Sequence, residues 1–124
     1  MNSVAVPISL GELIDKITIL EIKEYKLENN KAKNVINELN QLTIILNNLN
    51  FVIEEKLIDN LREVNKKLWE IEDLIRLKEK ENNFDDEFIK LARAVYKNND
   101  ERSKIKRNIN IIYKSDIIEE KSYK

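Results

Sequence analysis

The segment LIDNLREVNKKLWEIEDLI, residues 57–75, decides the fold of this chain. Its apolar side chains alternate spacings of four and three residues, which is the seam of a coiled coil. Charged side chains four residues apart, such as Glu63 and Lys67, support a helix on the flanks of that seam. The segment therefore predicts the longest and most regular helix, over about residues 52–81. The seam consists of Leu57, Leu61, Val64, Leu68, Ile71 and Ile75.

A further long helix is expected after the polar break NNFDD. Asp85 or Asn83 can cap it, because a short side-chain oxygen accepts hydrogen bonds from the free N–H groups of a first turn. The acidic residues that follow suit the positive end of the helix dipole. The apolar pattern then predicts a helix over about residues 85–114. Its stripe comprises Phe88, Ala92 and Val95, resumed by Ile105, Ile109 and Ile112.

Two shorter helices are expected upstream, over about residues 10–29 and 32–47. Ser9 and Glu12 fit a capping box, in which the serine caps the first turn and the glutamate lies three residues later. Asn29 is a suitable stop, because asparagine tolerates the left-handed conformation that ends many helices.

This pattern predicts an all-α fold, an antiparallel bundle of about four helices. The two longer helices form a hairpin on which a shorter hairpin packs. We expect one domain, residues 1–124, with extended or frayed ends at 1–8 and 115–124. An up-down path brings the two ends of the chain together, so VAVPI at 4–8 and SDIIEEKSY at 115–123 are expected to pair as a short ribbon.

Composition excludes several classes of chemistry. The 124 residues include no cysteine, which excludes disulfides, thiolate metal sites and cysteine nucleophiles. They also include no histidine, which removes the commonest general base and metal ligand. With 22 basic and 23 acidic residues the net charge is −1, which gives no overall field for nucleic acid or anionic lipid. No segment predicts a membrane span or an export signal, so we expect a cytoplasmic protein with no membrane contact.

The most informative feature is an interruption in the stripe of the last helix. After Val95 the next core positions are occupied by Asn98 or Asn99 and then by Arg102, before apolar residues return at Ile105. Several polar core positions in a row are unfavourable unless they are paired, because an unpaired buried charge costs several kcal/mol. The interruption therefore predicts a polar layer about halfway along the long hairpin.

Folding that hairpin about residue 83 identifies the neighbours of the layer. Arg102 then lies near Asn65, with Trp69 and Tyr96 at the margin. The first helix carries Asp15 and Glu21 close to its apolar stripe, and either carboxylate can reach Arg102.

Two interpretations of this layer stay open. In the first, it is a buried network that fixes the register of the helices, as a single core asparagine does in coiled coils. In the second, it binds a small polar or anionic ligand, which Arg102 holds, Asp15 and Asp73 orient, and Trp69 or Tyr96 stacks against. The candidate ligand-binding residues are Asp15, Trp69, Glu70, Asp73, Tyr96, Asn99 and Arg102.

Metal and nucleic-acid sites receive less support. The acidic residues of WEIEDLIR lack the spacing of a magnesium-binding helix pair, because Glu70 and Glu72 do not share a helix face. We therefore expect no metal and no cofactor. A line of basic residues on the last helix is a third possibility, nucleic-acid binding, but Asp100 and Glu101 interrupt it. The line consists of Lys90, Arg93, Lys97, Lys104 and Arg107.

Four blocks in order resemble a family of short bacterial and phage all-helical proteins that is catalogued as a domain of unknown function. The blocks are VPISLGELIDKITILEIK (6–23), VNKKLWEIEDLIRLKEK (64–80), FIKLARAVYKNNDERSKIKRNIN (88–110) and EEKSY (119–123). The resemblance implies one compact helical domain and brings no activity, substrate or site with it.

The sequence therefore favours a non-enzymatic interaction or accessory module, with a second copy or another protein as its partner. The extra apolar flank of the long central helix supports a homodimer. The alternative is a protein that binds or converts a small polar ligand in the polar layer.

Overall fold

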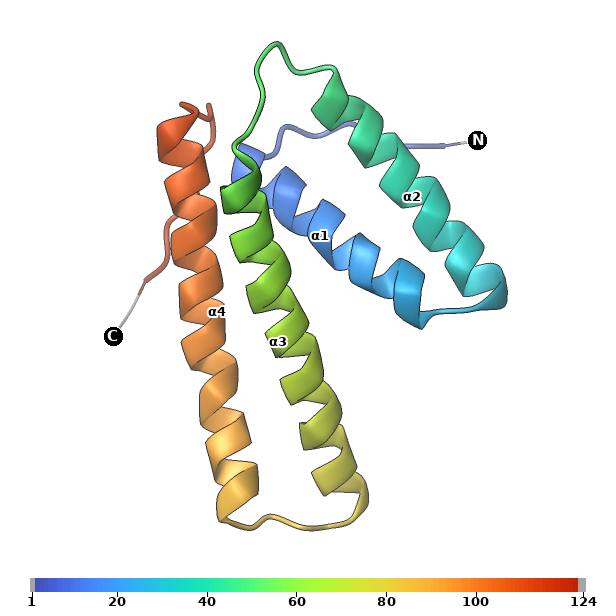
Figure 1. The fold of residues 1–124 in the computed structure, drawn as a ribbon, viewed down its shortest axis with the longest axis vertical. Helices are drawn as coiled ribbons and strands as arrows, with labels where there is room; N and C mark the ends of the chain where they lie inside the picture. The colour runs from blue at the N-terminus through green and yellow to red at the C-terminus, as the bar shows by residue number, and fades with distance from the viewer. Residues whose placement is uncertain (1, 123–124) are drawn as a thin grey trace.

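The computed structural model describes residues 2–122, and within this range the chain forms four α-helices joined by short connections (Figure 1). The expected all-α class is confirmed. The helices are α1 (Leu10–Lys26), α2 (Asn29–Asn47), α3 (Glu55–Lys80) and α4 (Asp86–Ile112).

Side-chain caps start two of these helices where the sequence predicts them. The Oγ atom of Ser9 accepts a hydrogen bond from the N–H group of Glu12 at 3.1 Å, which caps α1. The carboxylate of Asp85 accepts from the N–H group of Phe88 at 2.9 Å, which caps α4. Both caps satisfy first-turn donors that have no partner inside the helix.

The remaining helix ends differ from the prediction by a few residues. α1 ends at Lys26 instead of residue 29, and Asn29 takes a left-handed backbone (φ 59°) where α2 begins. α3 begins at Glu55 instead of residue 52, because residues 48–54 form a loop whose Ile53 is buried in the core. α4 ends at Ile112, two residues early, and Lys114 is also left-handed (φ 53°).

The helices form two hairpins that diverge from a common end (Figure 1). α3 and α4 make the most extensive helix pair, and α1 packs against both of them. α2 packs against α1 alone among the four helices. The result is the expected long hairpin with a shorter one on it, in which α1 is the central helix.

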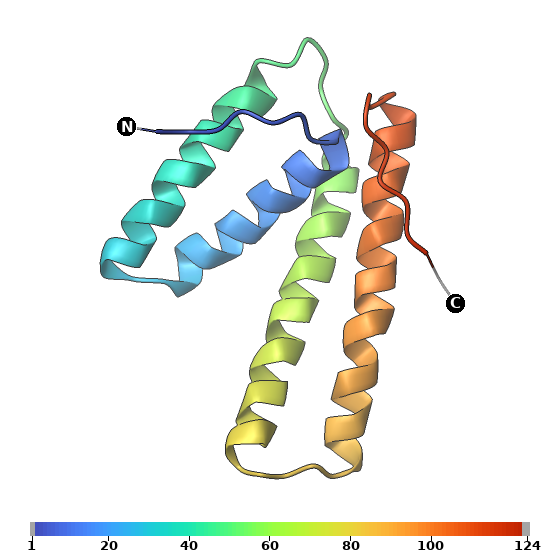
Figure 2. The ribbon, with the colours of Figure 1, turned by 180° about the vertical axis from the view of Figure 1, so that it is seen from behind.

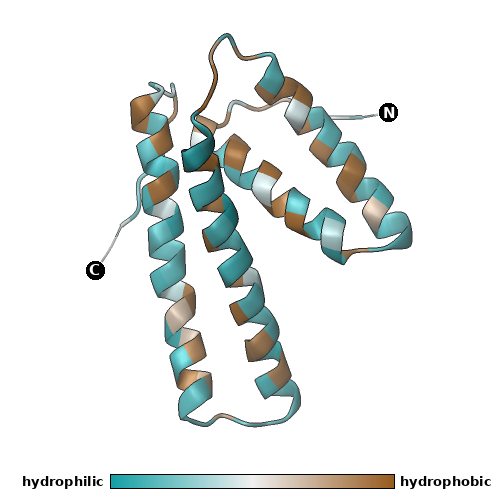
Figure 3. Ribbon diagram, viewed as in Figure 1, coloured by the Kyte–Doolittle hydropathy of each residue, from teal (hydrophilic) through white to brown (hydrophobic). Residues whose placement is uncertain are grey.

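The core lies at the common end of the two hairpins, where α1 begins and α4 ends. It contains Leu10 and Ile14 from α1, Ile53 from the loop, and residues of both long helices, with Leu61 and Ile109 fully buried. Apolar segments also colour the far halves of α3 and α4, away from this core (Figure 3). We call that far part, residues 68–99, the arm. Within it Ile71 is the one buried apolar side chain.

The expected ribbon between the two ends of the chain is wrong. Residues 2–8 and 115–122 adopt no strand. The first segment crosses α2 and the second runs back along α4 (Figure 2). The tail is instead attached through its side chains. Glu119 accepts a hydrogen bond from the hydroxyl group of Ser9, and Glu120 accepts one from Arg107 at 2.9 Å. Tyr123, part of the EEKSY block, lies outside the described residues.

No helix between residues 2 and 122 combines the length and apolarity needed to cross a membrane.

Candidate functional site

Asp15 on α1 is a buried carboxylate, and its residue has no exposed surface. Arg102 on α4 donates to it twice, from Nε to Oδ1 at 3.0 Å and from Nη2 to Oδ2. Asn65 on α3 donates a third hydrogen bond from Nδ2 at 2.8 Å. The ammonium group of Lys106 lies 3.6 Å away. One carboxylate of α1 is therefore bound by both helices of the long hairpin.

These contacts decide the charge of Asp15. Burial alone raises the pKa of its carboxyl group, because desolvation disfavours the charged form. The hydrogen bonds from Arg102 and Asn65, together with the positive charges of Arg102 and Lys106, outweigh that penalty and lower the pKa below its ordinary value. Asp15 in turn raises the pKa of Arg102. The two groups form an ionised pair at neutral pH.

A hydroxyl group completes the network. The Oγ1 atom of Thr18 accepts from Nδ2 of Asn65 at 2.9 Å and donates to the backbone oxygen of Asp15 at 2.9 Å. We call Asp15, Thr18, Asn65 and Arg102 the polar layer. Every buried side-chain nitrogen and oxygen atom among residues 2–122 has a hydrogen-bond partner. The layer therefore satisfies itself, as a stable buried network must.

The first turn of α1 is held against the end of α4, and this sets the position of Asp15. The N–H group of Gly11 donates to Oδ1 of Asn110 at 2.7 Å, and that of Leu10 donates to Oγ of Ser115 at 3.1 Å. A Cβ atom on Gly11 would lie 2.5 Å from the backbone oxygen of Lys106. Only glycine permits this approach, and it places Asp15 beside Arg102 one turn later.

Beside the polar layer a cleft of about 370 Å³ opens between α1, α3 and α4. The side chain of Arg102 is 28% exposed here, although its charge is paired with Asp15. Its Nη1 atom makes a long hydrogen bond of 3.5 Å to Oδ1 of Asn99. The cleft thus combines an indole, amides and charged groups of both signs. Its lining residues are Ile19, Asn65, Leu68, Trp69, Glu72, Asp73, Arg76, Asn99 and Arg102.

The structure brings together five of the seven residues that the sequence singles out. Trp69, Asp73, Asn99 and Arg102 line the cleft, and Asp15 lies behind Arg102. The other two, Glu70 and Tyr96, are exposed and lie outside the cleft lining.

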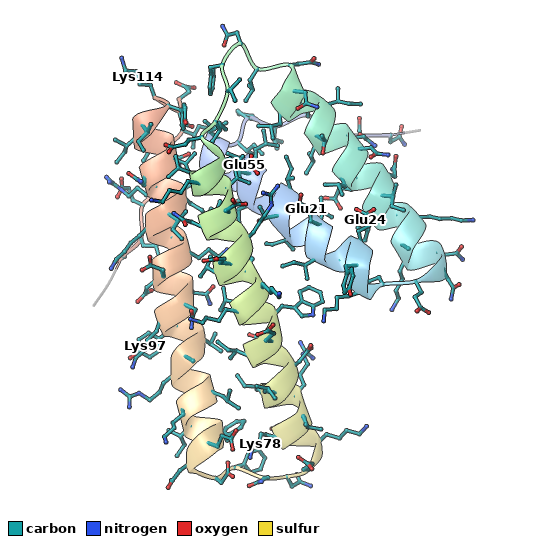
Figure 4. The ribbon with its side chains drawn as sticks, in the orientation of Figure 1. Glu21, Glu24, Glu55, Lys78, Lys97 and Lys114 are labelled. Atoms are coloured by element: carbon teal, nitrogen blue, oxygen red, sulfur yellow. The ribbon has the colours of Figure 1, made fainter. Side chains whose placement is uncertain are left out.

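The second carboxylate suggested for Arg102 has another partner. Glu21 accepts a hydrogen bond from Nε of Arg62 at 3.1 Å, and Glu55 accepts from the same guanidinium group at 2.7 Å. Glu21 lies well along α1 and Glu55 at the start of α3 (Figure 4). Glu21 is too far along α1 to reach the polar layer, because it is almost two turns beyond Asp15.

Several partners in the site are not among the sequence candidates. Asn65 was identified only as a neighbour of Arg102, and Thr18 and Lys106 were not identified. Little in the sequence marks these two residues as parts of a site. Thr18 is a single hydroxyl group in an apolar stripe, and Lys106 is one of many lysines. A clearer signal was Gly11, the only glycine of the chain, because glycine inside a helix often marks a close approach.

The geometry gives little support to a metal site or to a nucleic-acid site on α4. Between residues 2 and 122 no group of three or more acidic side chains is arranged to hold a metal ion. In the basic line of α4, Arg107 is paired with Glu120 at 2.9 Å.

Fold and site together define a small all-α protein in which a buried, ionised aspartate joins one helix to a long hairpin. Residues 4–124 match the model of the "Family of unknown function (DUF6165)", and the chain belongs to this family. The match confirms the resemblance to a family of unknown function. No curated protein and no solved structure matches the chain.

Proposed function

We propose that the protein is a non-enzymatic interaction module. In this proposal the polar layer fixes α1 across the α3–α4 hairpin and leaves the arm to a protein partner. The observation that carries the proposal is the self-sufficiency of the layer: the carboxylate of Asp15 is buried, and three hydrogen bonds from Arg102 and Asn65 satisfy it. A network that is complete within the chain has a structural role without any ligand.

The electrostatics of Asp15 supports this proposal over catalysis. A general base works best when its pKa lies near the working pH. The pKa of Asp15 lies below its ordinary value, and therefore further from neutral pH than that of a free aspartate. Arg102 is likewise a poor anchor for an anion, because Asp15 already neutralises its charge.

A small polar ligand in the cleft is the second candidate. The observation in its favour is that part of the Arg102 guanidinium faces the cleft, beside the amide of Asn99 and the indole of Trp69. These groups can donate hydrogen bonds to a polar molecule and stack against a flat one.

A thermal-shift panel separates the two candidates. The probes are Mg²⁺, Mn²⁺, ATP, a nucleoside diphosphate and glucose 6-phosphate, each added to the wild type and to Asn99→Ala. Asn99 accepts only one long hydrogen bond, so this variant leaves the polar layer intact. We expect no probe to raise the melting temperature by more than about 2 °C. A ligand present at a concentration far above its Kd would produce a larger rise. A larger rise that disappears in Asn99→Ala would overturn the proposal in favour of the ligand site.

A further inference from the structure

We propose that a groove between α1, α2 and the N-terminal segment binds the hydrocarbon chain of a free amphiphile with an uncharged head group, of the type of a long-chain alcohol. The groove has a volume of about 630 Å³ and shares no lining residue with the cleft beside the polar layer. Binding there is independent of the interaction function proposed above.

The three longest uncharged runs of the sequence meet at this groove. They are residues 39–53, 1–11 and 108–113, in a chain of which 36% of the residues are charged. Leu42 lines the groove from the first run, Leu10 from the second and Tyr113 from the third. An occupant of these walls displaces water without stripping it from an ion, which is the costly part of burying a surface. The walls are therefore suited to an apolar ligand.

The groove is elongated along α2. Its lining residues on that helix recur at steps of four and three residues from Glu38 to Ile45, which places them on one face over about 10 Å. Leu10 and Leu13 of α1, 9% and 5% exposed, form its floor. The segment before α1, which crosses α2 (Figure 2), closes another side through Val6 and its neighbours. This shape matches a chain better than a compact molecule.

The uncharged part of the lining selects hydrocarbon. Ten of the seventeen lining residues within 2–122 are apolar, and three more carry hydroxyl groups. The hydroxyl groups of Ser9, Tyr113 and Ser115 each already accept a hydrogen bond from a backbone N–H group. A site for a polar ligand needs convergent polar groups that are free to bind it. A hydrocarbon chain needs none, because it gives up no hydrogen bond with water when it enters.

The charged part of the lining selects the head group. It consists of Lys16, Glu38, Lys114 and Asp116, two residues of each sign. The two signs balance, so the groove offers no net attraction to offset the hydration that an anion or a cation loses on binding. An uncharged head group that stays in contact with water loses little hydration and suits this balance.

The volume favours a single chain over a helix of a partner protein. Pockets that bind small molecules hold about 300–1,000 Å³. The 630 Å³ of the groove lies within this range. A helix is about 10 Å wide, so two turns of it occupy about 850 Å³. A partner helix therefore does not fit inside the groove, whereas a single hydrocarbon chain does.

Displacement of a neutral fluorescent probe, N-phenyl-1-naphthylamine, measures binding to the wild type. 1-Hexanol, 1-octanol and 1-decanol are titrated against the bound probe. We expect one saturable site, with a Kd that falls by about tenfold or more for each added pair of methylene groups, because each buried methylene group lowers Kd about fourfold. A probe that does not saturate, or a Kd that is independent of chain length, would overturn the inference.

Two neighbouring isoleucines of α2 provide a matched pair of variants. Ile45 lines the groove and is 51% exposed, whereas Ile44 is 59% exposed and lies outside the lining. We expect Ile45→Glu to raise the Kd for 1-decanol by about tenfold or more, because it places a charge against the hydrocarbon chain. Ile44→Glu, the same change on the other side of α2, leaves the Kd unchanged. Circular dichroism checks that both variants are folded, and equal Kd values in the two would contradict the site.

Two comparisons test the head group and the source of the chain. We expect decanoate to bind more weakly than 1-decanol, and tighter binding of decanoate would overturn the uncharged head group. Flotation with phosphatidylcholine vesicles tests a bilayer as the source. We expect the protein to stay with the soluble fraction, and flotation of the wild type would overturn the free amphiphile in favour of a membrane surface.

Discussion

Replacing Gly11 with alanine tests how closely α1 and α4 approach. In an ordinary helix this change stabilises by about 1 kcal/mol, because alanine has the higher helix propensity. Here the added Cβ atom lies 2.5 Å from the backbone oxygen of Lys106 and 3.0 Å from Oδ1 of Asn110. The first atom belongs to backbone and cannot rotate away, so the helix axes must separate. Ordinary contact begins at 3.4 Å, which requires a movement of about 0.9 Å.

The magnitude follows from what that movement breaks. Overpacking of a well-packed contact costs about 1–3 kcal/mol. The hydrogen bond from Gly11 to Asn110, 2.7 Å long and buried, is stretched beyond its range, which leaves polar atoms unpaired at about 1–3 kcal/mol. After subtracting the gain in propensity of about 1 kcal/mol, we expect Gly11→Ala to lower the free energy of unfolding by about 1–5 kcal/mol.

The assay is urea unfolding followed by circular dichroism, with Glu24→Ala as a control at an exposed position of the same helix. We expect the control to change stability by less than about 0.5 kcal/mol. A Gly11→Ala variant as stable as the wild type, or more stable, would refute the close approach and the positioning of Asp15 that depends on it.

Three further predictions concern the polar layer and the loop before α3. Arg102→Ala leaves the buried carboxylate of Asp15 with Asn65 and a lysine, and we expect a loss of about 3 kcal/mol in urea unfolding; a loss below about 1 kcal/mol would contradict the pairing. Because the folded pKa of Asp15 is lowered, its contribution is present above the unfolded pKa of about 4 and lost as pH falls through the folded value. An acid titration of stability should therefore decline more steeply in the wild type than in Asp15→Asn, and equal slopes would contradict the lowered pKa. Tyr113→Phe removes the hydroxyl group that accepts from the N–H group of Glu54 at 2.7 Å and keeps the ring stacked on the loop, so we expect a loss of at most about 1 kcal/mol; a larger loss would show that the hydroxyl group anchors the loop.

The sequence predicted the class of fold and the place of the polar layer because both depend on local spacing. Four helices, the caps Ser9 and Asp85 and the polar interruption at Arg102 all follow from periods of three and four residues. The same periods identified Asp15 as one of two acids able to reach Arg102.

Local spacing could not decide how α1 crosses the long hairpin. That crossing determines whether Asp15 or Glu21 meets Arg102, and it depends on the contact between Gly11 and the backbone of Lys106, almost a hundred residues away. The ribbon between the chain ends was mispredicted for a related reason. An up-down path brings the two ends of the chain together and suggested a ribbon, whereas side chains of the tail bind Ser9 and Arg107 instead.

The capping of α1 by groups at the far end of α4 has a consequence for synthesis on the ribosome. Gly11 and its acceptor Asn110 are 99 residues apart, so the helix made first acquires its stabilising acceptor from the helix made last. At about 5–20 residues per second this interval lasts roughly 5–20 s. For that time the nascent α1 exposes its apolar face without its final docking surface, so α1 can dock stably only after the end of α4 has been made.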